Sequence, residues 1–376
     1  MGKKIHLIVA ARPNFMKVAP LYHALKATDW ANPVIVHTGQ HYDINMSDAF
    51  FTDLKLPEPD IHLEVGSGSH AEQTGRVMIA YEEILKKESP ELTVVVGDVN
   101  STIACAMACS KYHYPPEKNL PFTQTKIVHL EAGLRSFDRG MPEEINRILT
   151  DTISDVLWTP SEDGDENLIN EGVTKGKIVR IGNIMIDSLE MMRASIEKEN
   201  VCEEFNLKKS NYAVVTLHRP SNVDNKETLK KICTMLNETA ELLPLVFPLH
   251  PRTRKNLEEA GFMQLISNNE RITLVEPQSY IRFMSLVFNC RLVITDSGGI
   301  QEETTYIGIP CLTIRPNTER PITITQGTNQ LCTIADINSR VKNILSADYN
   351  MKYKVPDLWD GYTADRAVES IKKILE

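Results

Sequence analysis

The chain has 376 residues, more than one ordinary hydrophobic core organises, so two domains are expected. Its apolar fraction of 42% and charged fraction of 24% are typical of a soluble globular protein. The formal charge of −9, without a run of Lys or Arg, offers no basic surface to a nucleic-acid backbone, and no apolar segment approaches the length of a membrane span. We therefore expect neither a nucleic-acid nor a membrane partner.

Cysteine usage and the N-terminus indicate a reducing compartment. The seven cysteines are odd in number and form no C-x-x-C pair, so we expect small buried thiols and a cytoplasmic location. The apolar run at residues 5–11 is short and is interrupted by Arg12 and Pro13, which favours a first β-strand over a signal peptide.

Short β-rich runs alternate with helical stretches along the chain. The predicted strands are residues 5–11, 34–37, 93–96, 126–130 and 156–159 in the first half, and 213–217, 245–249, 272–275, 292–295 and 311–314 in the second. Strands that alternate with helices form parallel sheets, so the sequence predicts an α/β protein with two doubly wound domains.

The two sets of strands also predict the domain division. We expect a first domain at residues 1–182 and a second at residues 183–360. Residues 361–376 carry a helical apolar stripe and either pack back on the first domain or dock as an ordinary terminal helix.

Unusual polar residues stand where the predicted strands end. They are Arg12, Asp98, Glu131, His218, His250 and Ser297. Ligands of parallel α/β sheets bind at the carboxyl ends of the strands. Both halves contribute such residues, so the sequence predicts an active site in a cleft between two domains.

The segment from Thr295 to Glu303 predicts an anion site. A buried strand runs into Gly298 and Gly299, and a helix that opens with carboxylates follows. Free backbone N–H groups and the positive end of a helix dipole would then point at one place, where a phosphate binds. Because Glu302 and Glu303 repel phosphate, one of them is expected to reach ribose hydroxyls, which makes the ligand a nucleotide diphosphate. A plain tight turn is the alternative.

Two groups of cations are candidates for neutralising that diphosphate. Arg12 and Lys17 bracket the start of the first helix, where cations oppose the helix dipole, so an anionic ligand explains them better than stability does. Arg315 and Arg320 lie in a proline-containing loop after a strand.

The acidic candidates lie in the first half. Asp98 precedes a predicted helix and would be only its N-cap in the structural alternative. Glu143 and Glu144 follow Pro142 in a first helical turn, where acids are favoured by the dipole alone, and Arg147 one turn on would orient Glu143.

His218 and His250 each end a strand and are each followed closely by arginine, which favours contact with phosphate. The sequence has no H-x-x-x-H, no H-E-x-x-H and no Cys/His cluster, so no metal is expected. Carboxylates, cations and two histidines suit proton transfer and the stabilisation of a leaving diphosphate.

Eight motifs follow one another in a characteristic order. They are ARPNFMKVAP (11–20), TGQH (38–41), GD (97–98), HLEAGLR (129–135), PEEINR (142–147), LHRPSN (217–222), TDSGGIQEE (295–303) and TERP (318–321). Together they resemble the motifs of the non-hydrolysing UDP-N-acetylglucosamine 2-epimerases.

The resemblance implies a GT-B-like pair of Rossmann domains, no metal or other cofactor, and a homodimer. It implies interconversion of UDP-N-acetylglucosamine and UDP-N-acetylmannosamine, through elimination of UDP to a 2-acetamidoglucal and re-addition, for cell-surface polysaccharide precursors. Catalytic roles are implied for Asp98, Glu131, Glu143 and His218. UDP-binding roles are implied for Arg12, Lys17, Gln278, Phe283, Ser297, Gly298, Gly299, Glu303 and Arg320, with Glu303 on the ribose. The strand-end and helix arguments add Arg147 and His250 as substrate-binding candidates.

The chain departs from the family pattern at one place. Regulated bacterial members carry charged ligands for a second UDP-N-acetylglucosamine where this chain has Tyr42, Asp43, Pro220 and Ser221. We therefore expect no activation by substrate.

Three alternatives stay open at this stage. A hydrolysing epimerase would release UDP and N-acetylmannosamine, and a GT-B glycosyltransferase would pass the sugar to an acceptor. A non-catalytic UDP-sugar-binding regulator is the least favoured, because three carboxylates in an anion-binding cleft would weaken binding without serving chemistry.

Overall fold

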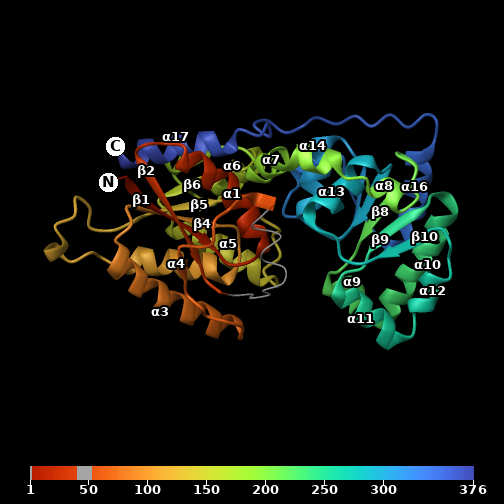
Figure 1. Cartoon of the computed structure of the whole chain (residues 1–376), viewed down its shortest axis with the longest axis horizontal. Helices are drawn as coiled ribbons and strands as arrows, with labels where there is room; N and C mark the ends of the chain where they lie inside the picture. The colour runs from red at the N-terminus through yellow and green to blue at the C-terminus, as the bar shows by residue number, and fades with distance from the viewer. Residues whose placement is uncertain (1, 40–52) are drawn as a thin grey trace. The chain divides into compact units, whose positions relative to one another are not determined.

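The computed structural model describes residues 2–39 and 53–376, which form two compact units (Figure 1). Unit 1 comprises Met1–Met191 and Asp357–Glu376, and unit 2 comprises Met192–Pro356. The boundary falls inside helix α7 (Ile184–Lys198), later in the chain than the expected division at residue 182.

Unit 1 is built on a parallel sheet with the strand order β3-β2-β1-β4-β5-β6-β7 among the described residues. The strands are β1 (Lys3–Val9), β2 (Ala31–His37), β3 (Ile61–His62), β4 (Leu92–Val96), β5 (Lys126–Leu130), β6 (Val156–Thr159) and β7 (Ile178–Arg180). The central strand β4 has the sequence LTVVV and is buried throughout. A run of β-branched residues without alternation is what a strand covered on both faces requires.

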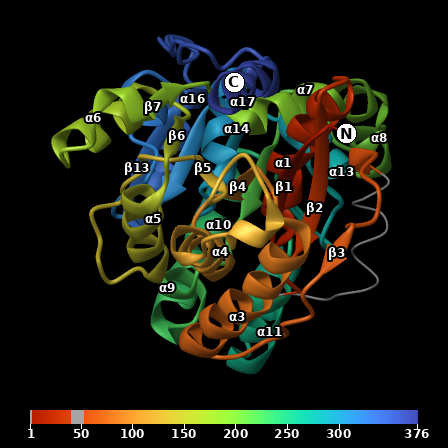
Figure 2. The same ribbon diagram turned by 90° about the vertical axis from the view of Figure 1, so that its left-hand side faces the viewer.

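Helices cover both faces of this sheet. They are α1 (Arg12–Lys26), α3 (His70–Glu88), α4 (Asn100–Lys111), α5 (Pro142–Ile153), α6 (Glu162–Asn170), α7 and α17 (Thr363–Leu375). Helices α3 and α4 lie side by side (Figure 2) and bury Tyr81 and Cys105 against the strands. On α17, Ser370 accepts a 3.0 Å hydrogen bond from the indole of Trp158 in β6, and the helix packs beside α1. The C-terminal helix is thus part of unit 1.

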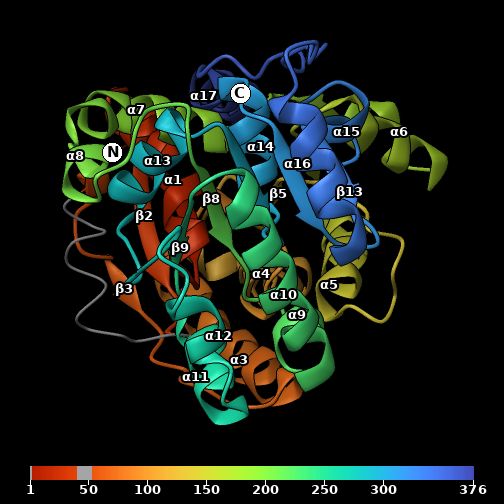
Figure 3. The same ribbon diagram turned by 90° about the vertical axis from the view of Figure 1, so that its right-hand side faces the viewer.

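Unit 2 repeats the plan with the strand order β10-β9-β8-β11-β12-β13. The strands are β8 (Ala213–Thr216), β9 (Leu245–Pro248), β10 (Ile272–Val275), β11 (Leu292–Thr295), β12 (Cys311–Ile314) and β13 (Asn329–Cys332). The helices are α8 (Val201–Glu204), α9 (Pro220–Val223), α10 (Lys226–Leu242), α11 (Pro251–Ala260), α12 (Met263–Ser267), α13 (Tyr280–Asn289), α14 (Gly299–Ile307), α15 (Ile322–Thr325) and α16 (Ile337–Leu345). Helices α10 and α16 lie side by side on one face of the sheet (Figure 3) and share its core.

The predicted fold class is confirmed, because both sheets are parallel and covered by helices. The sequence missed the short strands β3, β7 and β13, each of which lies at the edge of its sheet. All seven cysteines belong to the described residues and are buried free thiols. None of the described helices is both long enough and apolar enough to span a bilayer.

Candidate active site

Two carboxylates emerge side by side at the carboxyl edge of the unit 1 sheet. Strands β4 and β5 are neighbours, and their register pairs Val96 with Leu130, so Glu131 follows one residue and Asp98 two residues beyond that pair. The backbone is left-handed at Gly97 (φ 66°) and at Glu131 (φ 73°). A non-glycine residue in that region costs about 1–3 kcal/mol and marks a position held by its surroundings.

Glu131 is buried beside a cation of helix α1. Its Oε2 pairs with the ammonium group of Lys17, and its Oε1 is buried without a hydrogen-bond partner among the described residues. A Cβ at Gly97 would make only ordinary contacts, 3.4 Å from the Lys17 Nζ and 3.6 Å from the Glu131 Oε2, so it is the left-handed backbone that favours glycine at this turn. Lys17 thus balances the charge of Glu131, and its expected contact with a diphosphate stays a prediction.

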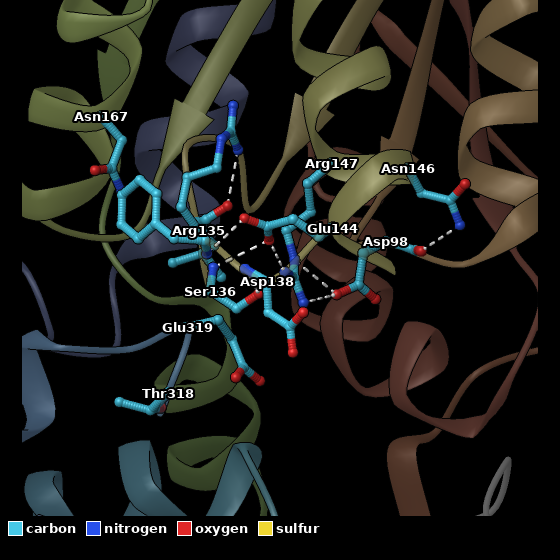
Figure 4. Close-up of polar contacts among 12 residues, drawn as sticks. Asp98, Arg135, Ser136, Asp138, Glu144, Asn146, Arg147, Asn167, Thr318 and Glu319 are labelled. Carbon is cyan, nitrogen blue, oxygen red and sulfur yellow. Dashed lines mark hydrogen bonds and ion pairs between the residues drawn. The ribbon is translucent and has the colours of Figure 1, made fainter. Parts of the chain in front are cut away.

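Asp98 is held by an arginine that also contacts a second carboxylate (Figure 4). The Asp98 Oδ2 lies 3.0 Å from the Nε and 2.8 Å from the Nη2 of Arg147. Another nitrogen of the same guanidinium pairs with the buried Glu144. Glu144 also accepts the backbone N–H groups of Ser136 and Phe137 at 3.0 and 2.8 Å. Arg147 therefore connects Asp98, whose side chain is 34% exposed, to the buried carboxylate of Glu144.

One expectation for α5 is corrected, and one structural alternative for α4 is excluded. Arg147 pairs with Glu144 and Asp98 instead of orienting Glu143, because Glu144 and Arg147 share the buried face of α5 while Glu143 is exposed. Asp98 is not the N-cap of α4, since that position is Val99 and it makes no side-chain capping bond.

The predicted anion turn in unit 2 lies at the start of α14. A Cβ at Gly299, the first residue of the helix, would meet no atom within 4 Å, whereas a Cβ at Gly298 would lie 2.7 Å from the Glu319 Oε1 and 2.9 Å from the Arg320 Nη1. Gly298 is thus required for the approach of the Arg320 loop. Gly299 leaves open space in front of the helix N-terminus, which is where an anion binds.

His218 follows β8 and is oriented by a buried carboxylate. Its Nδ1 lies 3.2 Å from the Asp296 Oδ1, and Asp296 also accepts the backbone N–H of His218 and of Arg219. Burial would raise the pKa of Asp296, but the hydrogen bonds and charge of His218 and its other donors hold that pKa below its usual value. With Nδ1 turned to Asp296, Nε2 is the nitrogen that His218 offers to a ligand.

His250 stacks on His218, with ring centroids 5.2 Å apart. Its Nδ1 accepts the backbone N–H of Arg252 and so caps α11. Burial and the neighbouring His218 lower the pKa of His250. This histidine therefore supports His218 and the helix start.

Glu303 and the two loop arginines have partners within unit 2. The Tyr280 hydroxyl donates a 2.6 Å hydrogen bond to the Glu303 Oε1. Arg320 lies between Glu302 (2.9 Å) and Glu319 (2.5 Å), and Arg315 pairs with Glu319 at 2.7 Å. The arginines predicted to face a diphosphate thus balance buried carboxylates. Arg315 is 6% exposed, and its ion pair with Glu319 lies in the interior of the loop.

The remaining candidates divide between described and undescribed residues. Gln278 and Phe283 flank Tyr280 at the start of α13, and Gln278 accepts a 2.9 Å hydrogen bond from Arg282. Arg12 begins α1, but its side chain lies outside the described part of the structure, as do residues 40–52 with Tyr42 and Asp43. Among described residues, no group of three or more His, Cys, Asp and Glu side chains is arranged to hold a metal ion.

Sequence reasoning missed several supporting residues of the site. Tyr280 belongs to none of the eight motifs, and Asp296 was visible only as part of one. Glu144 was an acidic candidate, but nothing in its spacing showed that it would be the partner of Arg147. The one signal in the sequence was the position of Asp296, between the end of a buried strand and the predicted anion turn. An acid buried there needs a partner.

The buried Glu303 predicts a pH dependence of stability. Burial raises its pKa from 4.5 to about 7, against the opposing hydrogen bond of Tyr280. A carboxyl whose folded pKa is raised contributes stability that is complete below the unfolded pKa and is lost as pH rises through the folded one. As the pH rises from 4.5 to 7, the free energy of unfolding of Glu303→Gln should therefore increase relative to that of the unsubstituted protein. Urea titrations at several pH values measure this, and a difference that is constant or runs the other way contradicts it.

Comparisons with known proteins agree with this geometry. A sequence profile described as UDP-N-acetylglucosamine 2-epimerase matches residues 23–372. The UDP-N-acetylglucosamine 2-epimerase of Methanocaldococcus jannaschii is 43% identical over 335 residues, which are 87% of this chain and 88% of that protein. The UDP-2,3-diacetamido-2,3-dideoxy-D-glucuronate 2-epimerase of Pseudomonas aeruginosa is 40% identical, over 87% of this chain and 88% of that protein.

Solved structures give the same result. The Methanocaldococcus jannaschii enzyme, in complex with UDP-GlcNAc and UDP, superposes with a TM-score of 0.86 at 40% identity and covers 98% of this chain and 99% of that one. Two Rossmann-like units, one with paired carboxylates and one with an anion turn, define an α/β protein of the GT-B-like fold. The chain belongs to the UDP-N-acetylglucosamine 2-epimerase family.

Proposed function

We propose that this protein catalyses the reversible C2 epimerisation of UDP-N-acetylglucosamine to UDP-N-acetylmannosamine without releasing free sugar. The observation that carries the proposal is the pair Asp98 and Glu131, set side by side and each held by a cation, Arg147 and Lys17. Two carboxylates are the minimum for removing a proton from one face of C2 and returning one to the other.

The chemistry explains why a diphosphate site belongs to the same reaction. The C2 proton has no adjacent carbonyl, so a carboxylate with a pKa of about 4 cannot remove it unless the C1–O bond opens and positive charge develops. In the proposed first half, C1–O breaks, UDP takes the bonding electrons, and one carboxylate takes the C2 proton to leave a 2-acetamidoglucal. In the second half, a proton reaches the opposite face of C2 and the UDP oxygen bonds to C1 again.

The residues of unit 2 are proposed to bind and stabilise the departing UDP. The N-terminus of α14 at Gly299 suits the diphosphate, because its N–H groups donate to negative charge that grows as the bond breaks. His218, whose Nδ1 faces Asp296, is proposed to turn its Nε2 towards the diphosphate. Glu303 suits the ribose hydroxyls. Arg12, Lys17, Gln278, Phe283 and Arg320 complete the proposed UDP set, and Glu143 supports the two C2 carboxylates.

Incubation with UDP-N-acetylglucosamine in heavy water separates the candidate activities. We expect deuterium at C2 in both sugars with the UDP linkage intact. Release of free N-acetylmannosamine and UDP would identify a hydrolysing epimerase instead. Absence of exchange would leave a glycosyltransferase or a binding protein and contradict the proposal.

The sugar decoration is tested in the same assay. One relative, 40% identical, is named for a diacetamido glucuronate, so UDP-2,3-diacetamido-2,3-dideoxy-glucuronate is the comparison substrate. We expect UDP-N-acetylglucosamine to show the higher kcat/KM, which fits a cytoplasmic role in supplying cell-surface polysaccharide precursors.

We also propose that substrate does not activate the enzyme. Proline and serine at residues 220 and 221 begin the short helix α9 and offer no charged ligand to a second nucleotide sugar. Initial rates from UDP-N-acetylmannosamine should follow a hyperbola without added UDP-N-acetylglucosamine. A lag or a sigmoidal rate curve that disappears when UDP-N-acetylglucosamine is added would contradict this proposal.

We propose a homodimer formed through α3 and α5. Ile79 of α3 is 68% exposed and Leu149 of α5 is 46% exposed, beside an apolar groove of about 600 Å³ lined in part by Met78 and Ile145. Exposed apolar surface of this kind is typical of an interface. Sedimentation should show a dimer that Leu149→Glu converts to a monomer, while Leu265→Glu, at an exposed leucine of unit 2, leaves it intact. A monomeric unsubstituted protein, or a dimer that tolerates Leu149→Glu, contradicts this interface.

A further inference from the structure

A buried histidine connects the two carboxylate-bearing turns of unit 1. His129 lies in β5, two residues before Glu131, and is fully buried. Its Nε2 donates a 2.8 Å hydrogen bond to the carbonyl oxygen of Gly97, the residue before Asp98. Its Nδ1 lies 2.6 Å from the Oδ1 of Asp151 on α5. One ring therefore contacts the Asp98 turn directly.

Asp151 completes the connection on the Glu131 side. Its Oδ2 accepts the backbone N–H of Gly133 at 3.1 Å and pairs with Arg135 at 2.7 Å. Arg135 is in turn held by both oxygens of Glu171 at 2.7 Å. A continuous chain of contacts thus runs from the Gly97 carbonyl through His129 and Asp151 to the Gly133 amide.

The contacts of the pair fix the orientation of His129 and the charge of Asp151. A carbonyl oxygen only accepts, so the Nε2 of His129 carries a hydrogen. Burial would raise the pKa of Asp151, but the charges and hydrogen bonds of His129 and Arg135 outweigh burial and hold that pKa below its usual value. Asp151 therefore presents an ionised carboxylate to the Nδ1 of His129 and to the guanidinium of Arg135.

Stability alone is a weak reason for this arrangement. The attraction within a buried ion pair is largely offset by the cost of removing both charges from water. What the pair does determine is backbone position. It holds Gly97 and Gly133, which have φ of 66° and 80° and enclose Glu131 at 73°. Without such ties, the left-handed conformation of Glu131 would relax.

We propose that His129 and Asp151 are positioning residues of the epimerase reaction, which act through the backbone of Gly97 and Gly133 to set the placement of the Asp98 and Glu131 carboxylates. The inference rests on the proposed function, because it assumes that these two carboxylates move the C2 proton. Neither residue contacts the sugar in this role.

The test compares His129→Asn and Asp151→Asn with a matched control. Asparagine at 129 retains a donor towards Asp151 but is too short to reach the Gly97 carbonyl, and asparagine at 151 removes the charge that His129 and Arg135 face. The control is His6→Gln, at an equally buried histidine of β1 whose Nδ1 lies 3.1 Å from the Tyr81 hydroxyl. Steady-state kinetics below the melting temperature of every variant are combined with hydrogen exchange of the backbone amides.

Both test variants should lower kcat by about 10²-fold with little change in KM, because a small misplacement of catalytic groups has that effect while most of the proposed UDP-binding residues belong to unit 2. The amides of residues 97–100 and 131–135 should exchange faster than in the unsubstituted protein. His6→Gln should change neither quantity. A kcat equal to that of the control, a loss confined to KM, or unchanged exchange in both turns overturns the inference. An unsubstituted protein without C2 exchange refutes the proposed function, and the amide exchange still decides whether the pair holds the turns.

Discussion

Replacement of Glu131 by glutamine is expected to lower kcat for epimerisation by about 10³-fold, within the range that a general acid or base contributes. Glutamine keeps the size of the side chain but can neither take nor return a proton, and it leaves the buried Lys17 ammonium without its negative partner. UDP binding should change far less than kcat, because most of the proposed nucleotide residues belong to unit 2. Steady-state kinetics and calorimetric titration with UDP measure both quantities.

Glu88→Gln is the matched control for that substitution. Glu88 is a carboxylate of unit 1 that pairs with Lys4 at 2.7 Å near the surface, at the amino end of β1 and β4 and thus at the opposite end of the strands from the two turns. The kcat of Glu88→Gln should equal that of the unsubstituted protein. If Glu131→Gln retained a tenth or more of kcat, Glu131 would not be one of the two groups at C2.

The second large effect is expected for Arg147→Met. Removing the guanidinium leaves the buried Glu144 without its cation, and losing one partner of a buried ion pair costs about 3–5 kcal/mol of unfolding free energy. Asp98 also loses the group that fixes its carboxylate, so kcat should fall as well. Urea denaturation and kinetics at a temperature where the variant is folded separate the two effects.

The double variant Arg147→Met with Glu144→Gln tests which effect is catalytic. Glutamine at 144 removes the uncompensated buried charge, and its single oxygen still accepts one of the two N–H groups of Ser136 and Phe137, which bind different oxygens of Glu144, so part of the lost stability should return. The loss of kcat should remain, since Asp98 is still unsupported. Recovery of kcat together with stability would mean that Arg147 acts on folding alone.

The central strands could be predicted from sequence because their composition is dictated by burial. Strand β4, with five buried residues, and strand β11 consist of apolar and threonine side chains in unbroken runs. The edge strands carry no such signal. Strand β13 reads Asn-Gln-Leu-Cys and β3 has two residues, so neither composition nor length separates them from loops.

The positions of Asp98 and Glu131 could also be predicted, since residues after buried parallel strands share one edge of the sheet. Their partners could not. Lys17 and Glu131 are 114 residues apart in the chain, and Arg147 and Asp98 are 49 apart. Which charged side chains meet depends on helix rotation and packing, as the choice of Glu144 over Glu143 by Arg147 shows. Asp151 offered still less, because it reads as an ordinary polar residue of an amphipathic helix.

Positional isotope exchange tests most directly whether the bond between sugar and UDP opens and closes during epimerisation. The substrate is UDP-N-acetylglucosamine with ¹⁸O in the bridge between C1 and the β-phosphorus. If UDP leaves and returns while bound, its β-phosphate can rotate, and the label should appear in non-bridging positions of both UDP-N-acetylglucosamine and UDP-N-acetylmannosamine. Epimerisation with the label confined to the bridge would show that C1–O never breaks, and would contradict elimination and re-addition as the mechanism.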